Sequence, residues 1–320
     1  MFRIARAACI AALALAAVVT QAQAQGYPNK PVRMIVPFAP GGSGDFNARL
    51  INEKLSAIWG QPVLVEYFAG ANTQIGTDLV AKAQPDGYTL LISSTAFVVN
   101  PSMYAKLPYD PVKDFIPVTN VSTFPFAFVA ANSFPVKNVG ELIALERAKP
   151  GSISFGTSDS SAALVGYLFN SMAKTNMQSV SYKGAGPMMT DVAGGHVQIG
   201  IAGTSSVQSL VRAGRVRLIG IASTQKSQLF PDTPLIGQTV PGFEAISWFG
   251  LFAPRGTPQD IVTKIHRDVA TVVKDPDILK RLSEAAADPG GETPSEFGAR
   301  VRKEIDLWAK VAKSANIKPE

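Results

Sequence analysis

Short apolar runs, each followed by a loop of glycine or hydroxyl residues and then by a helical segment, recur along this chain. The first such unit begins with an apolar run at Val32. It continues through a loop containing Gly41, Gly42 and Gly44 and predicts a helix that ends at Gly60. Strands that alternate with helices favour parallel sheets, because each helix carries the chain back to start the next parallel strand. The sequence therefore predicts an α/β fold.

The loop of this first unit has the composition of an anion-binding site. Asp45 is predicted to cap the helix that follows, with Leu50, Leu55 and Ile58 on its apolar face. Amides of such a loop and of the first helical turn have no intrahelical partners, and they lie at the positive end of the helix dipole. A carboxylate suits this position. The alternative is a tight turn that only packs the helix on the sheet.

Single positions exclude the better-known glycine loops. The dinucleotide fingerprint G-x-G-x-x-G would need a third glycine where Asn47 stands. A nucleotide-binding P-loop would need Lys and Ser or Thr where Asp45 and Phe46 stand. A nucleophile elbow G-x-S-x-G that begins at Gly41 fails at Asp45. The loop therefore matches none of these three motifs.

The first 24 residues have the composition of a secretory signal peptide. Arg3 and Arg6 precede a largely apolar run, and 22–24 is an A-x-A cleavage site, so we expect export and removal of residues 1–24. The single cysteine, Cys9, lies in this segment, so no disulfide and no cysteine metal site is expected in the mature chain. Although the formal net charge is +6, the basic residues are scattered, and nucleic-acid binding is not expected.

Two apolar strands, predicted at 124–130 and 248–254, divide the chain into two lobes. Strand–loop–helix units precede the first strand and fill the segment between the two. We predict a first lobe of residues 25–123 and 249–320 and a second lobe of residues 124–248. Each lobe is expected to be a mostly parallel sheet flanked by helices, with two interlobe crossings, few interlobe contacts and a cleft between the lobes.

Glycine and hydroxyl residues also follow the later predicted strands, where open α/β sheets bind ligands. The chain has only two histidines, His196 and His266, and neither lies in a pattern typical of a catalytic base. Polar loops that meet at one cleft without a nucleophile, a base or a metal cluster favour binding over turnover, so no cofactor and no metal are expected. The candidate residues of these later loops are Ser94, Thr157, Ser158, Ser160, Lys183, Gly184, Ala185 and Thr204.

Five motifs occur in order along the chain. They are P-F-x-x-G-G-x-x-D-x-x-A-R from Pro37, P-D-G-Y-T-L-L from Pro85, L-P-Y-D-P-x-x-D-F from Leu107, Y-K-G-x-x-P from Tyr182, and W-F-G-L-F-A-P-x-G-T-P from Trp248. Together they resemble the periplasmic substrate-binding proteins of tripartite tricarboxylate transporters, the Bug/TctC family. The resemblance covers the whole mature chain.

This resemblance implies a two-lobed periplasmic binding protein of a Gram-negative bacterium. It implies a monomer that delivers a small organic acid to a large and a small membrane subunit. The family holds one ligand carboxylate between the first glycine loop and a loop of the second lobe, often through backbone amides and bound water. On this pattern the binding residues are Phe38, Gly41, Gly42, Ser43 and Asp45 of the first lobe, and Lys183, Gly184 and Ala185 of the second, with Thr157, Ser158 and Ser160 beside them.

The second loop departs from the family pattern N-x-P-G-A-G-G-x-x-G. The altered positions are Tyr67, Ala69, Asn72 and Thr73. We expect Phe38, Phe97 and the Asn72–Thr73 pair to face the far end of the ligand, which favours a mono- or dicarboxylate with an apolar or aromatic body over citrate.

Two further functions follow from the same residues. One is a periplasmic sensor of this fold that presents its ligand to a signalling receptor. The other is an exported hydrolase with Ser158 or Ser43 as its nucleophile, which would lack a base in the sequence.

Overall fold

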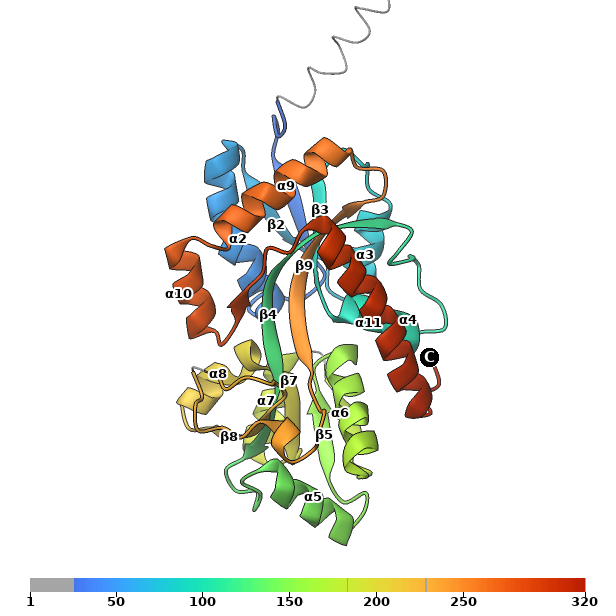
Figure 1. Ribbon diagram of the computed structural model, residues 1–320, viewed down its shortest axis with the longest axis vertical. Coiled ribbons are helices and arrows are strands. Elements are labelled where there is room, and N and C mark those ends of the chain that lie inside the picture. The colour runs from blue at the N-terminus through green and yellow to red at the C-terminus, as the bar shows by residue number, and fades with distance from the viewer. Residues whose placement is uncertain (1–25, 183, 228, 320) are drawn as a thin grey trace, which may run out of the picture.

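The computed structural model describes residues 26–182, 184–227 and 229–319 (Figure 1). The predicted signal peptide at 1–24 lies outside the described residues. In chain order the elements are β1 (Val32–Val36), α2 (Ser43–Trp59), β2 (Val63–Tyr67), α3 (Gln74–Ala81), β3 (Thr89–Ser94), α4 (Ala96–Met103), β4 (Phe115–Ala131), α5 (Val139–Ala148), β5 (Ser154–Thr157), α6 (Ser160–Ala173), β6 (Gln178–Ser181), α7 (Ala185–Gly194), β7 (Ile199–Gly203), α8 (Thr204–Arg212), β8 (Val216–Ile221), the 3-10 helix η1 (Ile236–Gln238), β9 (Ile246–Pro254), α9 (Gln259–Val272), α10 (Pro276–Glu284), β10 (Asp288–Pro289) and α11 (Pro294–Ser314).

The long strand β4 joins two halves of one ten-stranded sheet, whose order is β2-β1-β3-β9-β4-β7-β5-β6, with β8 and β10 also paired to β4. β4 pairs with β9 up to Pro125 and with β7 from Phe126 onward. We call the half with β1, β2, β3, β9 and β10 the upper lobe and the half with β5, β6, β7 and β8 the lower lobe, as oriented in Figure 1.

The predicted two-lobed α/β fold is confirmed, with one difference in strand direction. β1 is parallel to β2 and β3, and β5 is parallel to β6 and β7. Every pairing of β4 or β9 is antiparallel, so each lobe is mixed rather than mostly parallel. The reason is that β4 leaves the upper lobe while β9 returns to it, so the two run in opposite directions. The exact lobe boundaries at 123/124 and 248/249 stay a prediction.

Helices α2 and α9 cover one face of the upper sheet, above an apolar cluster that includes Met34 and Val36 of β1. In α2, Leu50 and Leu55 are buried as predicted, whereas Ile58 is 49% exposed. Ile58 lies in the last turn, one residue before Trp59, which is buried in its place. The prediction for Ile58 was therefore wrong, because the apolar stripe of α2 ends on Trp59.

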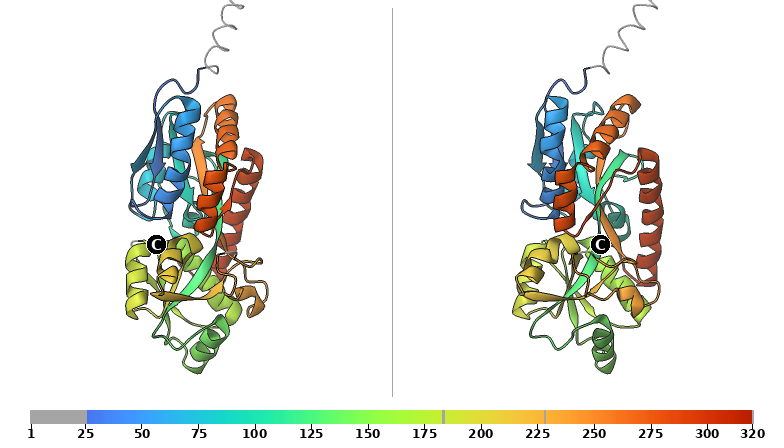
Figure 2. Two further views of the ribbon diagram at one scale, coloured as in Figure 1. Left: turned by 90° about the vertical axis from the view of Figure 1, so that its left-hand side faces the viewer. Right: turned by 60° about the vertical axis from the view of Figure 1, so that its left-hand side comes forward.

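The opposite face carries an apolar cluster that continues from one lobe into the other. It contains Phe97, Trp248 and Phe252 in the upper part and Phe128 and Phe155 in the lower part. Helix α11 runs down this side and contacts both α4 and α6 (Figures 1 and 2). The lobes therefore share more contacts here than the sequence predicts. Within the described ranges, none of the helices has the length and apolar character that crossing a membrane requires.

Trp248 lies where β9 pairs with Thr123 of β4, between the lobes. Its indole ring is fully buried, and its Nε1 donates a hydrogen bond of 2.8 Å to Oε2 of Glu304 on α11. Burial raises the pKa of the Glu304 carboxyl to about 7, although the hydrogen bond from Trp248 and the charge of Arg300 act to lower it. The carboxyl therefore keeps its proton in the folded protein at pH values where the unfolded chain has lost it.

We predict that Glu304→Gln becomes more stable relative to the wild type as the pH rises. In the wild type, the free energy of unfolding should fall between pH 4.5 and about 7, because the unfolded chain ionises first. The neutral amide removes this loss, for a relative gain of up to about 3 kcal/mol. Urea unfolding from pH 5 to pH 8 measures it, with the exposed Glu53→Gln as control. A stability difference that is constant across this range would contradict the prediction.

Candidate functional site

The glycine loop between β1 and α2 needs its glycines for different reasons. Gly41 has a φ of +84°, which L side chains rarely adopt. Gly42 is the N-cap of α2 with a φ of −95°, and a Cβ there would meet only the carbonyl oxygen of Ala39 at 3.9 Å. A Cβ on Gly44 would lie 2.6 Å from Cδ2 of Phe38. Gly41 thus sets the turn, Gly44 allows Phe38 to pack, and Gly42 leaves open space in front of the helix.

Asp45 is not the cap of α2, because the helix begins two residues earlier at Ser43. The carboxylate instead braces the loop: Oδ2 accepts a hydrogen bond of 2.8 Å from the amide of Gly41, and Oδ1 accepts from Arg49 at 2.6 Å and from Tyr67 at 2.5 Å. Because Asp45 and Arg49 are four residues apart in a predicted helix, the sequence predicts a pair between them, and the structure confirms it. Burial acts to raise the pKa of Asp45, but the hydrogen bonds from Tyr67, Gly41 and Arg49 outweigh it and hold the pKa below its usual range.

The hydroxyl of Ser43 contacts the lower lobe. Its Oγ lies 2.6 Å from Oγ of Ser206 and 3.3 Å from Oγ of Ser205, both in the first turn of α8. Thr204, the first residue of α8, donates from Oγ1 to the carbonyl oxygen of Ala286 at 2.9 Å. The N-terminal ends of α2 and α8 therefore meet between the lobes, and Figure 2 shows the two helices on the same side of the molecule.

A second contact between the lobes joins α6 to α4. Ser160 donates from Oγ to Oδ1 of Asn100 at 2.9 Å. The Asn100 side chain is fully buried, and its Nδ2 donates to the carbonyl oxygen of Asn72 at 2.9 Å. Ala71, Asn72 and Thr73 all have positive φ values of 43°, 49° and 75°. The buried amide of Asn100 thus links the left-handed second loop to the lower lobe.

The other predicted residues of the strand ends differ in how their polar atoms are used. Oγ of Ser94 accepts a hydrogen bond of 3.2 Å from the amide of Ala96 at the start of α4. Thr157 is fully buried, and its Oγ1 has no hydrogen-bond partner among the described residues. Ser158 lies half-buried on the bend between β5 and α6. Gly184, with a φ of +108°, is the N-cap of α7, and Ala185 is its first residue.

Lys183 lies outside the described residues, so its role stays a prediction.

Phe38 is half-buried, with its ring centroid 5.7 Å from that of Phe249. Phe97 is fully buried and stacks on Phe252 at 4.3 Å, so the expectation that it faces the ligand was wrong. Phe97 lies on α4, a helix that the sequence did not predict and that is buried along most of its length, which accounts for its burial.

The strand ends place several helix N-termini between the lobes. Helices α2 and α4 begin after β1 and β3 in the upper lobe, and α6, α7 and α8 begin after β5, β6 and β7 in the lower lobe. First-turn amides carry partial positive charge and lack intrahelical partners. Ser43 contacts the first turn of α8, and Ser160 at the start of α6 contacts Asn100 in the second turn of α4. Such an arrangement can hold an anion with neutral donors from both sides.

The geometry gives no support to catalysis at Ser43 or Ser158. His196 donates its backbone amide to Asp191 at 2.9 Å, and His266 lies on α9 in the upper lobe. None of the hydrogen bonds found in the described ranges joins either histidine to these serines. Ser43 shares its hydroxyl with Ser206 instead.

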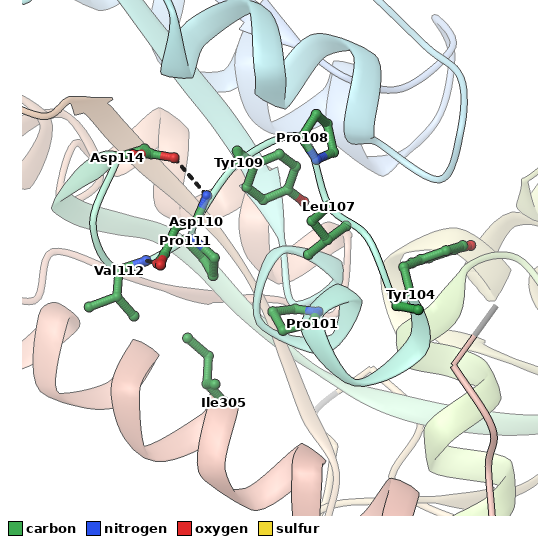
Figure 3. A pocket seen from close by; sticks show the side chains of 11 residues that line it. Pro101, Tyr104, Leu107, Pro108, Tyr109, Asp110, Pro111, Val112, Asp114 and Ile305 are labelled. Atoms are coloured by element: carbon green, nitrogen blue, oxygen red, sulfur yellow. Dashed lines mark hydrogen bonds between the residues drawn. The ribbon is translucent and has the colours of Figure 1, made fainter.

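A surface hollow of about 620 Å³ lies elsewhere, between the segment 101–114 and α11 (Figure 3). Its wall is the turn of the L-P-Y-D-P-x-x-D-F motif, where Oδ2 of Asp114 accepts a 2.6 Å hydrogen bond from the amide of Asp110. Pro101 and Tyr104 place it at the C-terminal end of α4, opposite Ala96. It is therefore separate from the helix N-termini.

The sequence patterns did not predict Asn100, Ser205 and Ser206 as parts of the site, and they did not predict the contact of Tyr67 with Asp45. The two serines directly follow Thr204 in a hydroxyl-rich loop, which is a usable signal. The sequence around Asn100 contains no comparable signal, because a polar residue before Pro101 is typical of an ordinary turn.

Comparisons with known proteins agree with this geometry. A family model described as "Tripartite tricarboxylate transporter family receptor" matches residues 47–316. BugT of Bordetella pertussis is 33% identical over 311 residues, which cover 96% of this chain and 95% of BugT. An R. palustris protein solved with adipate is 34% identical, with a TM-score of 0.88 over 92% of this chain and 100% of that one. MatC of Rhodopseudomonas palustris, solved with bound malate, is 29% identical, with a TM-score of 0.82 over 89% and 100%.

We predict that the three loop glycines respond differently to alanine. Gly44→Ala should destabilise the fold by about 1–3 kcal/mol, because Phe38 must move. Gly41→Ala should cost about 1 kcal/mol through its positive φ. Gly42→Ala should change stability by less than about 0.5 kcal/mol, since its Cβ enters open space. Urea unfolding of the three variants measures this order, and an equal cost at Gly42 and Gly44 would contradict it.

Proposed function

Because this chain belongs to the tripartite tricarboxylate transporter receptor family, we propose that it binds an organic carboxylate between its lobes and delivers it to the large and small membrane subunits of a transporter. The family and the structural neighbours are periplasmic solute-binding proteins and not enzymes, so the hydrolase alternative is set aside. Residence in the periplasm, removal of residues 1–24 and a monomeric state belong to the same proposal.

The observation that supports carboxylate binding best is the meeting of helix N-termini from both lobes. Ser43 at the start of α2 lies within hydrogen-bond distance of Ser206 in the first turn of α8. Nearby strand ends contribute Thr157, whose buried hydroxyl has no partner among the described residues. A buried hydroxyl without a partner is costly, and a ligand oxygen would satisfy it. Amides and hydroxyls from two sides match the several acceptor lone pairs of a carboxylate.

We assign the donors residue by residue. In the upper lobe, the first-turn amides from Ser43 onward face the acid, with Gly42 leaving room for it and Phe38 and Ser94 beside it. In the lower lobe the proposed residues are Thr157, Ser158, Ser160, Lys183, Gly184, Ala185 and Thr204. Gly41 and Asp45 take part through the shape of the loop, because the amide of Gly41 already donates to Asp45.

The ligand that we propose is a mono- or dicarboxylate. The adipate and malate of the two solved relatives both belong to this class. Phe38 still favours an apolar body, whereas Phe97 no longer supports it because it packs in the core. Apart from Lys183 the proposed donors are neutral, and such a set compensates one or two negative charges more readily than the three of citrate.

A thermal-shift screen of mono-, di- and tricarboxylates tests this proposal, since a ligand that binds only the native state raises the Tm. We expect mono- or dicarboxylates to raise it and citrate to give the smaller shift. Calorimetry on Gly42→Val then tests the place of binding: the added side chain should abolish binding of that acid, with the circular dichroism spectrum unchanged. No response to any acid would contradict carboxylate binding, and full affinity in a folded Gly42→Val protein would place the acid elsewhere.

Uptake experiments separate transport from sensing. Deletion of the cognate large membrane subunit should abolish uptake of the identified acid. Unchanged uptake, together with loss of an acid-dependent transcriptional response when this chain is deleted, would favour the sensor.

A further inference from the structure

Tyr67 is the last residue of β2, and its hydroxyl reaches the helix that follows the glycine loop. The hydroxyl donates to Oδ1 of Asp45 at 2.5 Å and accepts a hydrogen bond of 3.0 Å from Arg49. Its ring packs, half-buried, against the apolar cluster beneath α2. The phenol is therefore held by the sheet at one end and by a charged pair at the other.

Asp45 links Tyr67 to the glycine loop, because its carboxylate accepts hydrogen bonds from both. Its side chain is 13% exposed, and its second oxygen accepts from the amide of Gly41, the residue with a φ of +84°. Three donors from three places in the chain thus converge on one carboxylate. Hydrogen bonds to an ionised acceptor are the strong ones among side-chain contacts.

Arg49 alone does not account for the position of this carboxylate. Its side chain is 58% exposed and comes from the same helix as Asp45, one turn later. An exposed pair within one helix contributes little and leaves the helix free to move as a unit. Tyr67 comes from the neighbouring strand, so its hydroxyl fixes the first turn of α2 relative to the sheet.

We propose that Tyr67 is a positioning residue for the carboxylate site: through Asp45 it holds Gly41 in its left-handed conformation and so aims the amides that follow. This inference rests on the proposed function for its purpose and on the geometry alone for its mechanism. The amide of Gly41 donates to Asp45 and fixes the loop, and the amides of the next residues are left to donate to the ligand.

The charge state of Asp45 gives the proposal a spectroscopic readout. The groups that face its carboxylate are Tyr67 from β2, Arg49 from α2 and the amide of Gly41 from the loop. Because the hydrogen bonds lower the pKa of Asp45 against the effect of burial, removing the Tyr67 hydroxyl should raise that pKa. The shift of the Gly41 amide proton, which is bonded to the carboxylate, should follow the titration.

The test compares Tyr67→Phe with Tyr88→Phe in 15N-labelled full-length protein, with Asp45→Asn as a second variant. Tyr88 is also half-buried, and its hydroxyl bonds to Asn29 away from the glycine loop. Tyr88→Phe is therefore a matched control that removes a comparable hydroxyl without affecting the loop. The Gly41 amide is followed from pH 3 to pH 7. We expect its midpoint to lie higher in Tyr67→Phe than in the wild type, to stay unchanged in Tyr88→Phe, and to disappear in Asp45→Asn.

Binding is measured on the same variants at pH 7 with adipate and with malate as probes. Tyr67→Phe should weaken the binding of whichever acid the wild type binds by about tenfold, because affinity falls in proportion to the fraction of molecules whose loop is held in the binding conformation. Tyr88→Phe should leave the affinity unchanged. An equal Gly41 midpoint in the wild type and Tyr67→Phe, or an unchanged affinity in Tyr67→Phe, would overturn the proposal. Failure of both acids to bind the wild type would count against the proposed ligand class, and the Gly41 midpoint would then decide the link from Tyr67 to the loop by itself.

Discussion

The antiparallel pairing of β4 with β9 is the constraint on which the rest of the structure depends. The two strands run together from Phe115 and Pro254 to Pro125 and Ile246, and β4 then continues into the lower lobe. Because both lobes are built on this shared pair, one region between the lobes receives the ends of β1, β2 and β3 from above and of β5, β6, β7 and β8 from below. Topology therefore places the N-termini of α2, α3, α4, α6, α7 and α8 there, at the position where open α/β sheets bind ligands.

The contacts that close this region are uncharged. On the α2–α8 side Ser43 meets Ser206 through their hydroxyls, whereas Ser160 meets Asn100 on the side where α11 packs on α4 and α6. Hydrogen bonds of this kind contribute only about 1 kcal/mol each. The opposite side, with Trp248 and α11, is joined by a continuous apolar core. This asymmetry suits a protein that opens on the α2–α8 side while the α11 side holds the lobes together.

Local patterns predicted most of the architecture, because strand–loop–helix units are encoded within short segments. The order of units, the two crossing strands and the Asp45–Arg49 pair could be obtained in this way. Helix α4 could not, since Pro101 inside it resembles a helix break, although a proline in the last turn removes only one backbone hydrogen bond. With α4 unpredicted, Phe97 was assigned to the ligand rather than to the core.

The position of the site stays a prediction, and the contacts between the lobes were not predicted. Sequence spacing identified loops that end strands, and two of the loops that it identified lead into helices that contact the other lobe, at Ser43 and at Ser160. It could not identify which hydroxyls pair with each other, because Ser43 and Ser206 are 163 residues apart and meet only after both lobes have folded. Nor could it distinguish a carboxylate that faces a ligand from one that braces a loop, as Asp45 does with Tyr67.

The central claim is that one acid is held by helix N-termini of both lobes at once. Titration of 15N-labelled protein with the acid that most raises the Tm tests it directly, with amide shifts recorded along the whole chain. We predict that the amides of Ser43 and Gly44 at the start of α2 shift at the same acid concentration as those at the starts of α6 and α8. Shifts confined to one lobe, or to the hollow between the segment 101–114 and α11, would contradict it.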